Sequence, residues 1–187
     1  MTPASPLDVA RHVAKVLDSA GYRYALGGAI ALAYWAAPRA TVDVDVGVDA
    51  APMSAPDLVR VLVDAGFEID EARALDAASR GDFGARYQGV RVDVFLTVLP
   101  MTESALLRRV EVPMGSTRVF ILSAEDVALH KLLFGRTKDF ADLERLFAVQ
   151  GERLDFAYLD HWVSATFDEG DARVVRYREL RARFSTV

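Results

Sequence analysis

Residues 24–48 read YALGGAIALAYWAAPRATVDVDVGV, and this stretch decides the fold. The short run 22–26 is β-prone and ends at a glycine pair. The alanine-rich segment 29–37 predicts a buried helix, which Pro38 ends because its ring cannot continue a helix. Segment 42–48 alternates valine with aspartate or glycine, and this two-residue period predicts a β-strand. The stretch is therefore expected to fold as strand, glycine turn, helix and strand.

The rest of the chain carries further helical and strand patterns. A helix is expected over 7–20, where apolar residues recur with a helical period. Further helices are expected over 56–65, 101–109, 123–134, 138–148 and two segments within 154–184. Alternation predicts a short strand and two hairpins, namely 67–69, 85–87 with 90–98, and 110–114 with 118–122. The strands precede the helix-rich last third, so we expect an α+β fold with a sheet-containing domain 1–122 and a helical domain 123–187.

Composition narrows the class of protein. The chain has 187 residues, 52% of them hydrophobic, and no cysteine. This excludes a disordered chain, disulfide scaffolds and thiolate metal sites. No apolar run approaches the ~20 residues that span a bilayer, and the start lacks a signal-peptide pattern, so we expect no membrane association and a cytoplasmic location. The net charge of −5 argues against a broad nucleic-acid coat but leaves room for a local site.

Two carboxylates follow one face of the strand at 42–48. Residues two apart in a strand point to the same side, so Asp43 and Asp45 project together. Neighbouring carboxylates repel unless a cation lies between them, and Mg²⁺ prefers such oxygen ligands. The alternative is the polar face of an ordinary surface strand.

A third carboxylate, Asp93, lies inside the apolar strand VRVDVFL at 90–96. An unpaired carboxylate among valines is costly to bury, so it needs a cation or an arginine nearby. Two readings follow: Asp93 pairs with Arg91 on the same face, or it is a third metal ligand. Gly27 and Gly28, where a strand meets a helix, allow a ligand to approach the backbone and its free N–H groups.

The order strand, Gly-Gly, helix, Asp-x-Asp strand and later lone aspartate resembles the minimal nucleotidyltransferase superfamily with its polymerase-β-like palm. Residues 24–48 are especially similar to the toxin-like, abortive-infection-type group, and the resemblance covers about residues 8–148. It implies a mixed β-sheet with flanking helices as a palm-like core over 1–122, followed by a C-terminal helical part over 123–187.

The resemblance also implies the chemistry. Asp43, Asp45 and Asp93 would be the catalytic residues and the ligands of two Mg²⁺ ions, which clamp a nucleoside triphosphate and activate an acceptor hydroxyl. Gly27 and Gly28 would place backbone N–H groups on the triphosphate. The implied partners are an NTP, an RNA, tRNA or protein acceptor, and a cognate antitoxin.

A second match covers residues 128–142, with a helical lysine followed by Arg-x-Lys-Asp and another acid three residues on. It implies that Lys131 meets the nucleotide phosphates. The nucleotide-binding set is completed by the following residues: Arg39, Thr41, Lys138 and Asp139. Alternatives remain open for three parts of this set. Lys131 could instead be a snorkelling lysine, whose amine reaches solvent. Residues 136–142 could form a structural ion-pair network. Arg39 could pair with a carboxylate rather than clamp a phosphate.

Three functions compete at this point. The first is an active Mg²⁺-dependent nucleotidyltransferase. The second is an inactive relative that only binds a nucleotide or a partner chain. The third is an enzyme that modifies a small molecule, as antibiotic nucleotidyltransferases do. The five arginines between 173 and 183 are either a solvated helix face or a phosphate-binding edge. Neither the acceptor nor the oligomeric state follows from the sequence.

Overall fold

The computed structural model describes residues 4–184, which divide into two compact units. The first unit comprises residues up to 30 together with 40–122, and the second comprises 31–39 together with the residues from 123 onward. Helix α2 (Gly28–Trp35) is shared, because its first three residues belong to the first unit. The division into domains at residue 122 stays a prediction, and residues 1–3 and 185–187 lie outside the described part.

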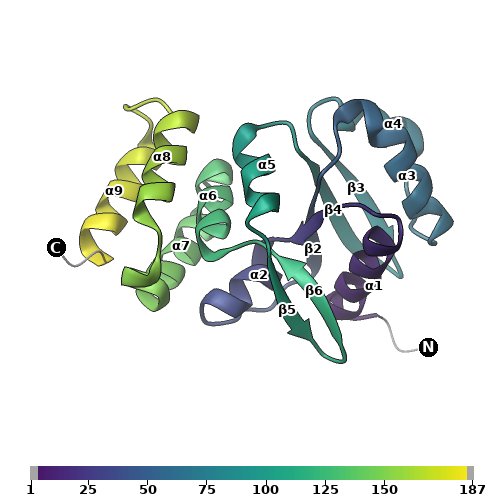
Figure 1. The fold of residues 1–187 in the computed structure, drawn as a ribbon, viewed down its shortest axis with the longest axis horizontal. Helices are drawn as coiled ribbons and strands as arrows, with labels where there is room; N and C mark the ends of the chain where they lie inside the picture. The colour runs from purple at the N-terminus through teal and green to yellow at the C-terminus, as the bar shows by residue number, and fades with distance from the viewer. Residues whose placement is uncertain (1–3, 185–187) are drawn as a thin grey trace. The chain divides into compact units, whose positions relative to one another are not determined.

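A mixed six-stranded sheet organises the first unit, with the strand order β3-β4-β2-β1-β6-β5 (Figure 1). Its strands are β1 (Tyr24–Leu26), β2 (Asp43–Val48), β3 (Asp82–Tyr87), β4 (Val90–Leu96), β5 (Val110–Met114) and β6 (Thr117–Ile121). The pairs β2–β4 and β1–β6 are parallel, and the other three pairs are antiparallel. Parallel neighbours need crossover connections, which helices supply here. The predicted α+β fold with a mixed sheet is confirmed.

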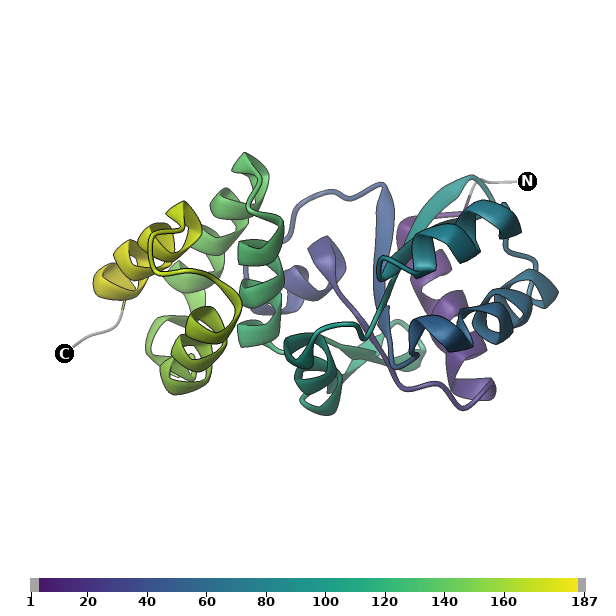
Figure 2. The same ribbon diagram turned by 90° about the horizontal axis from the view of Figure 1, so that it is seen from above.

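Helices cover both faces of this sheet (Figure 2). They are α1 (Pro6–Ser19), α3 (Ala55–Asp64), α4 (Glu71–Ala78) and α5 (Pro100–Leu107), with a 3₁₀ turn, η1 (Pro52–Ser54), before α3. Val44, Val46 and Val48 are fully buried on the face covered by α1. On the opposite face, the Leu106 side chain of α5 lies close to Gly47. The valines of β2 therefore fill the core, and the intervening positions face the other way.

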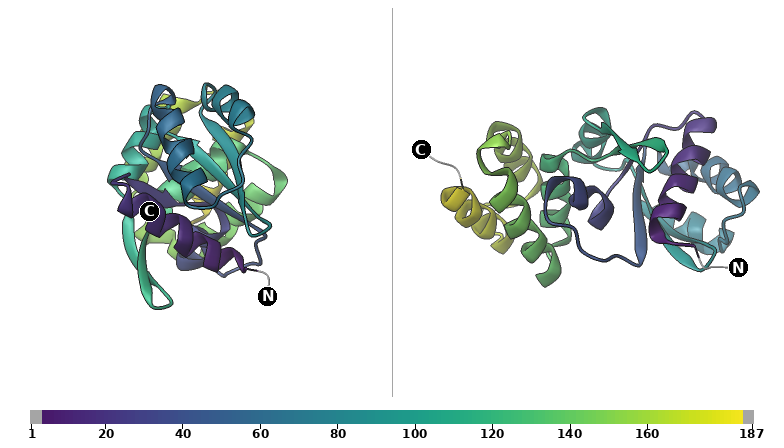
Figure 3. Two further views of the ribbon diagram at one scale, coloured as in Figure 1. Left: turned by 90° about the vertical axis from the view of Figure 1, so that its right-hand side faces the viewer. Right: turned by 90° about the horizontal axis from the view of Figure 1, so that it is seen from below.

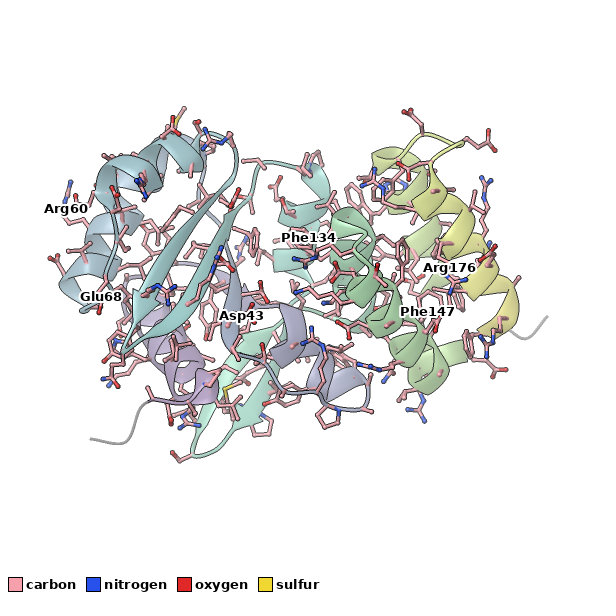
Figure 4. All side chains as sticks on the ribbon, turned by 180° about the vertical axis from the view of Figure 1, so that it is seen from behind. Asp43, Arg60, Glu68, Phe134, Phe147 and Arg176 are labelled. Atoms are coloured by element: carbon pink, nitrogen blue, oxygen red, sulfur yellow. The ribbon has the colours of Figure 1, made fainter. Side chains whose placement is uncertain are left out.

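The second unit is helical, with α6 (Ala124–Phe134), α7 (Thr137–Gln150), η2 (Gly151–Arg153), α8 (Phe156–Thr166) and α9 (Ala172–Phe184) (Figure 3). Ser123 begins α6, because its hydroxyl accepts the N–H of Asp126 at 3.1 Å and so caps the helix. Phe147, which Figure 4 labels, is fully buried. Its ring packs near those of Phe156 and Tyr177. The predicted C-terminal helical part is confirmed.

The structure corrects the element prediction in two places. Residues 67–69 were expected to form a strand, but they contribute only an isolated bridge between Glu68 and Arg86. Helix α4 was not expected, because its sequence EARALDAA has few large apolar residues. Asp70 begins this helix, since its side chain accepts the N–H of Arg73. Within residues 4–184 no helix combines the length and apolar character needed to cross a membrane.

Candidate active site

Three aspartates lie side by side on neighbouring strands of the first unit. In the parallel β2–β4 pair, Asp45 stands opposite Asp93 and Asp43 stands opposite Arg91. Partners in register share a face of the sheet, and so do residues two apart along a strand. The three carboxylates therefore project from the same face, opposite the buried valines, and Figure 4 labels Asp43 at the start of β2.

Each of these carboxylates faces a different neighbour. Arg91 Nε donates to Asp93 Oδ1 at 2.8 Å, and Arg91 Nη2 lies 2.7 Å from the same oxygen. Thr41 Oγ1 donates to Asp43 Oδ1 at 2.6 Å. Asp45 turns towards Gly28. In the described chain, consequently, no three histidine, cysteine or acidic side chains are grouped to hold a metal ion.

The glycine pair lies against Asp45. Gly28 opens α2 with a φ of +54°, and Asp45 Oδ2 lies 1.8 Å from the point where a Cβ on residue 28 would stand. No other residue type fits there. The N–H of Gly27 donates to the carbonyl of Asp45 at 2.9 Å, so this N–H group already has a hydrogen-bond acceptor in the sheet. The first-turn N–H groups of α2 are the ones that a helix leaves without an internal acceptor.

Arg91 supplies positive charge on the aspartate face. Its hydrogen bonds with Asp93 raise the pKa of its guanidinium, and the charges of Asp93, Asp43 and Asp45 raise it further. The pairing of Asp93 with Arg91, one of the two readings of the sequence, is what the structure shows. The donor set itself, three carboxylates at adjacent positions, has the chemistry that a hard divalent cation prefers.

The helical unit holds a second charged cluster. Lys131 Nζ lies 3.1 Å from Asp139 Oδ1 and 2.8 Å from Asp142 Oδ2, and the three side chains are at most 7% exposed. Arg39 Nε donates to Asp142 at 3.1 Å, and Arg136 Nε donates to Asp139 at 2.6 Å. This is the ion-pair network that the sequence left open as an alternative.

The charges of this cluster compensate one another. Burial by itself raises the pKa of Asp139, but hydrogen bonds from Arg136 and Lys131 lower it, and the net direction is down. The pKa of Asp142 is lowered in the same way by Arg39 and Lys131. Both carboxylates are therefore held in the charged form.

The predicted nucleotide-binding residues thus fall into two groups. Gly27, Gly28 and Thr41 lie beside the aspartates in the first unit, whereas a second group belongs to the helical unit, namely Arg39, Lys131, Lys138 and Asp139. Lys138 is exposed next to the cluster. Sequence analysis missed Arg145, which lies 3.3 Å from Asp142. Its spacing of three residues on one helix was the available signal.

Four of the five arginines of α9 are paired with acids. Arg176 contacts both Glu144 and Glu179, and three further pairs have the same character, namely Arg173–Asp171, Arg178–Glu169 and Arg181–Asp160. These arginines form a salt-bridged helix surface, in line with the reading of a solvated face.

Comparisons with known proteins identify the family and the fold. One family model, described as "Nucleotidyl transferase AbiEii toxin, Type IV TA system", matches residues 14–184. No curated protein matches the sequence.

Solved structures share the fold. The antibiotic-resistance factor ANT(2'')-Ia is 13% identical with a TM-score of 0.58, over 85% of this chain and 94% of that one. A nucleotidyltransferase-like protein from Paracoccidioides brasiliensis is 16% identical with a TM-score of 0.52, over 97% and 94%. The lincosamide antibiotic adenylyltransferase LnuA is 13% identical with a TM-score of 0.51, over 75% and 95%.

Proposed function

Because the chain belongs to the AbiEii nucleotidyl transferase toxin family, and is thereby a nucleotidyltransferase, we propose that it moves a nucleoside monophosphate from an NTP to an acceptor hydroxyl with the help of Mg²⁺ and releases pyrophosphate. One observation supports the site most strongly. The parallel register of β2 and β4 sets Asp45 opposite Asp93, with Asp43 two residues away on the same face. A glycine turn and a helix N-terminus adjoin this carboxylate group.

Asp43, Asp45 and Asp93 are the residues that would hold the metal, as two ions. Once bound, the ions neutralise charge on the triphosphate and lower the pKa of the acceptor hydroxyl. Binding requires the carboxylates to turn from their present partners, Thr41 and Arg91 among them. The donor chemistry fits a magnesium site, since Mg²⁺ takes one or two carboxylates together with phosphate oxygens.

The remaining roles fall to residues of the first unit. The N-terminus of α2, which begins at Gly28, offers N–H groups and a positive helix-dipole end to phosphate. Gly27 positions this turn through its bond to the carbonyl of Asp45. Asp93 takes the proton from the acceptor hydroxyl. A nucleotide contact by Lys131, Lys138, Asp139 or Arg39 stays a prediction.

The acceptor is proposed from the family. We take a macromolecule, RNA, tRNA or protein, as the first candidate acceptor. The family description, a toxin of a type IV TA system, supports a cognate antitoxin as partner. The second candidate is a small-molecule acceptor, because two proteins with the same fold are an antibiotic-resistance factor and a lincosamide antibiotic adenylyltransferase. The third is an inactive protein that binds a nucleotide or a partner.

A labelling experiment separates these candidates. The purified chain is incubated with each α-labelled NTP, Mg²⁺ and one acceptor at a time: total RNA, a cell extract, or an aminoglycoside and a lincosamide. We expect label in one macromolecular fraction, and loss of labelling in Asp45→Asn. The control is Asp49→Asn, an exposed aspartate that pairs with Arg23. Nucleotide binding without any labelled product would favour the inactive protein, and label on an antibiotic would favour the second candidate.

A further inference from the structure

Arg91 occupies a special position among the three aspartates. It stands opposite Asp43 in the β2–β4 register and two residues before Asp93, so all of these side chains share one face. Its Nε lies 2.8 and 3.1 Å from the two oxygens of Asp93, and its Nη2 lies 2.7 Å from one of them. The Arg91 side chain is 61% exposed, whereas that of Asp93 is 21% exposed. The guanidinium thus covers the carboxylate from the solvent side.

The positive charge of Arg91 offsets repulsion among the three aspartates. Three carboxylates at adjacent positions repel one another, and this repulsion destabilises the site unless a cation lies among them. All three aspartates raise the pKa of Arg91, so its positive charge interacts with the whole group. An arginine stays protonated at any ordinary pH and matches a carboxylate with two parallel donors. It can therefore compensate the aspartates in the absence of metal.

Asp45 completes the metal-free arrangement. Its carboxylate rests against Gly28 at the start of α2, where the proposed function places a phosphate. Thr41 engages Asp43 on the other side. Arg91 thus supplies the positive charge that a metal ion would supply, and Asp45 occupies the place proposed for a phosphate.

We propose that Arg91 is a built-in counter-ion of the aspartate site, which holds Asp93 when no metal is bound and which a divalent ion displaces. This inference rests on the proposed function, because it takes Asp93 as a metal ligand. The ion and the guanidinium compete for the same carboxylate oxygens. Removal of the guanidinium therefore tightens metal binding and weakens the metal-free protein.

Arg86 provides a matched control. It lies on β3 directly opposite Arg91 in the β3–β4 register, so it presents the same charge from the same face. Its guanidinium donates to the carbonyl of Gly89 at 3.1 Å. Arg86→Gln thus removes an equivalent exposed charge without touching Asp93.

The test measures Mn²⁺ binding by calorimetric titration of chelator-treated protein, without nucleotide. We expect Arg91→Gln to bind Mn²⁺ about fivefold more tightly than the wild type, the scale of a partly exposed ion pair. Arg86→Gln should stay within about twofold. Arg91→Lys, which keeps the charge but loses the two-donor fit, should fall between Arg91→Gln and the wild type. The metal-free melting temperature of Arg91→Gln should lie about 2–4 °C below that of Arg86→Gln, and saturating Mn²⁺ should close this gap.

The outcomes are distinguishable. Equal Mn²⁺ affinity in Arg91→Gln and Arg86→Gln, with wild-type binding that Asp93→Asn removes, overturns the counter-ion and leaves the proposed function standing. Weaker Mn²⁺ binding in Arg91→Gln than in Arg86→Gln likewise overturns the counter-ion. If the wild type binds no Mn²⁺, or if Asp93→Asn binds it as the wild type does, the proposed metal site fails and the inference fails with it.

Discussion

Residue 28 has to be glycine for two separate reasons. Its φ of +54° lies in the left-handed region, where a side chain costs about 1–2 kcal/mol. A Cβ there would also meet Asp45 Oδ2 at 1.8 Å. Glycine at position 28 therefore leaves the space that the Asp45 carboxylate occupies.

We therefore expect Gly28→Ala to lower the free energy of unfolding by more than backbone strain alone explains. Gly21→Ala is the control, because Gly21 has a φ of +76° but no heavy atom within 4 Å of its Cβ position. Gly21→Ala should cost about 1 kcal/mol, and Gly28→Ala at least about twice as much because Asp45 must also move. Urea unfolding measures the free energy of unfolding of both variants. An equal decrease in the two would show that the Asp45 side chain moves aside without cost.

At the scale of elements, the pairing of α6 with α7 depends on a buried lysine. Lys131 on α6 bridges Asp139 and Asp142 on α7, and both acids are almost fully buried. Removing one partner of a buried ion pair leaves charge uncompensated, which typically costs about 3–5 kcal/mol. Arg39 and Arg136 keep part of the compensation, so we expect Lys131→Met to cost about 3 kcal/mol.

Lys138→Met is the matched control, because Lys138 is exposed on α7 and should change stability by less than about 0.5 kcal/mol. Both tryptophans of the chain, Trp35 and Trp162, belong to the helical unit, so tryptophan fluorescence during urea unfolding reports on this unit. If Lys131→Met unfolds at the same urea concentration as Lys138→Met, the cluster does not stabilise α6 against α7.

The same two acids give the helical unit a predictable response to acid. The folded pKa values of Asp139 and Asp142 are depressed, so the stability they contribute is fully present above their ordinary pKa of about 3.9. It is lost as the pH falls through the lower folded values. We expect the free energy of unfolding, followed by tryptophan fluorescence, to fall steeply below about pH 4. Asp142→Asn should flatten this dependence, whereas the exposed Asp57→Asn should leave it unchanged. A steep fall that persists in Asp142→Asn would assign the acid response to other groups.

For the whole molecule, the proposed function predicts stabilisation by substrate. A ligand that binds only the folded state adds about 2.7 kcal/mol at a hundredfold excess over its Kd. For a chain of this length, that corresponds to a rise of about 5–10 °C in melting temperature. We expect one NTP with Mg²⁺ to produce this rise in a thermal scan, and a chain with both Asp43→Asn and Asp45→Asn to lack it. An unchanged melting temperature with all four NTPs and either Mg²⁺ or Mn²⁺ would contradict the proposed activity.

The sequence by itself determined the local structure and the chemistry-bearing positions. The period of two in 42–48 placed valines on one face and aspartates on the other, because successive side chains of a strand alternate. The glycine pair, the Ser123 cap and the helical periods located most of the remaining elements, and their order gave the α+β class. Family membership was visible for the same reason, since its motifs lie within short segments.

Only the tertiary structure decided which of these groups meet. The first half of β3, with Asp82 and Gly84, lacks strand propensity and forms because it pairs with β4. The register of Asp45 against Asp93 joins strands nearly fifty residues apart, and a slip of one residue would have turned one carboxylate into the core. The pairing of Asp93 with Arg91, and of Lys131 with two aspartates, depends on distances in folded space. Sequence spacing constrains such distances within a single element, where the backbone is regular, but not between elements whose packing sets them.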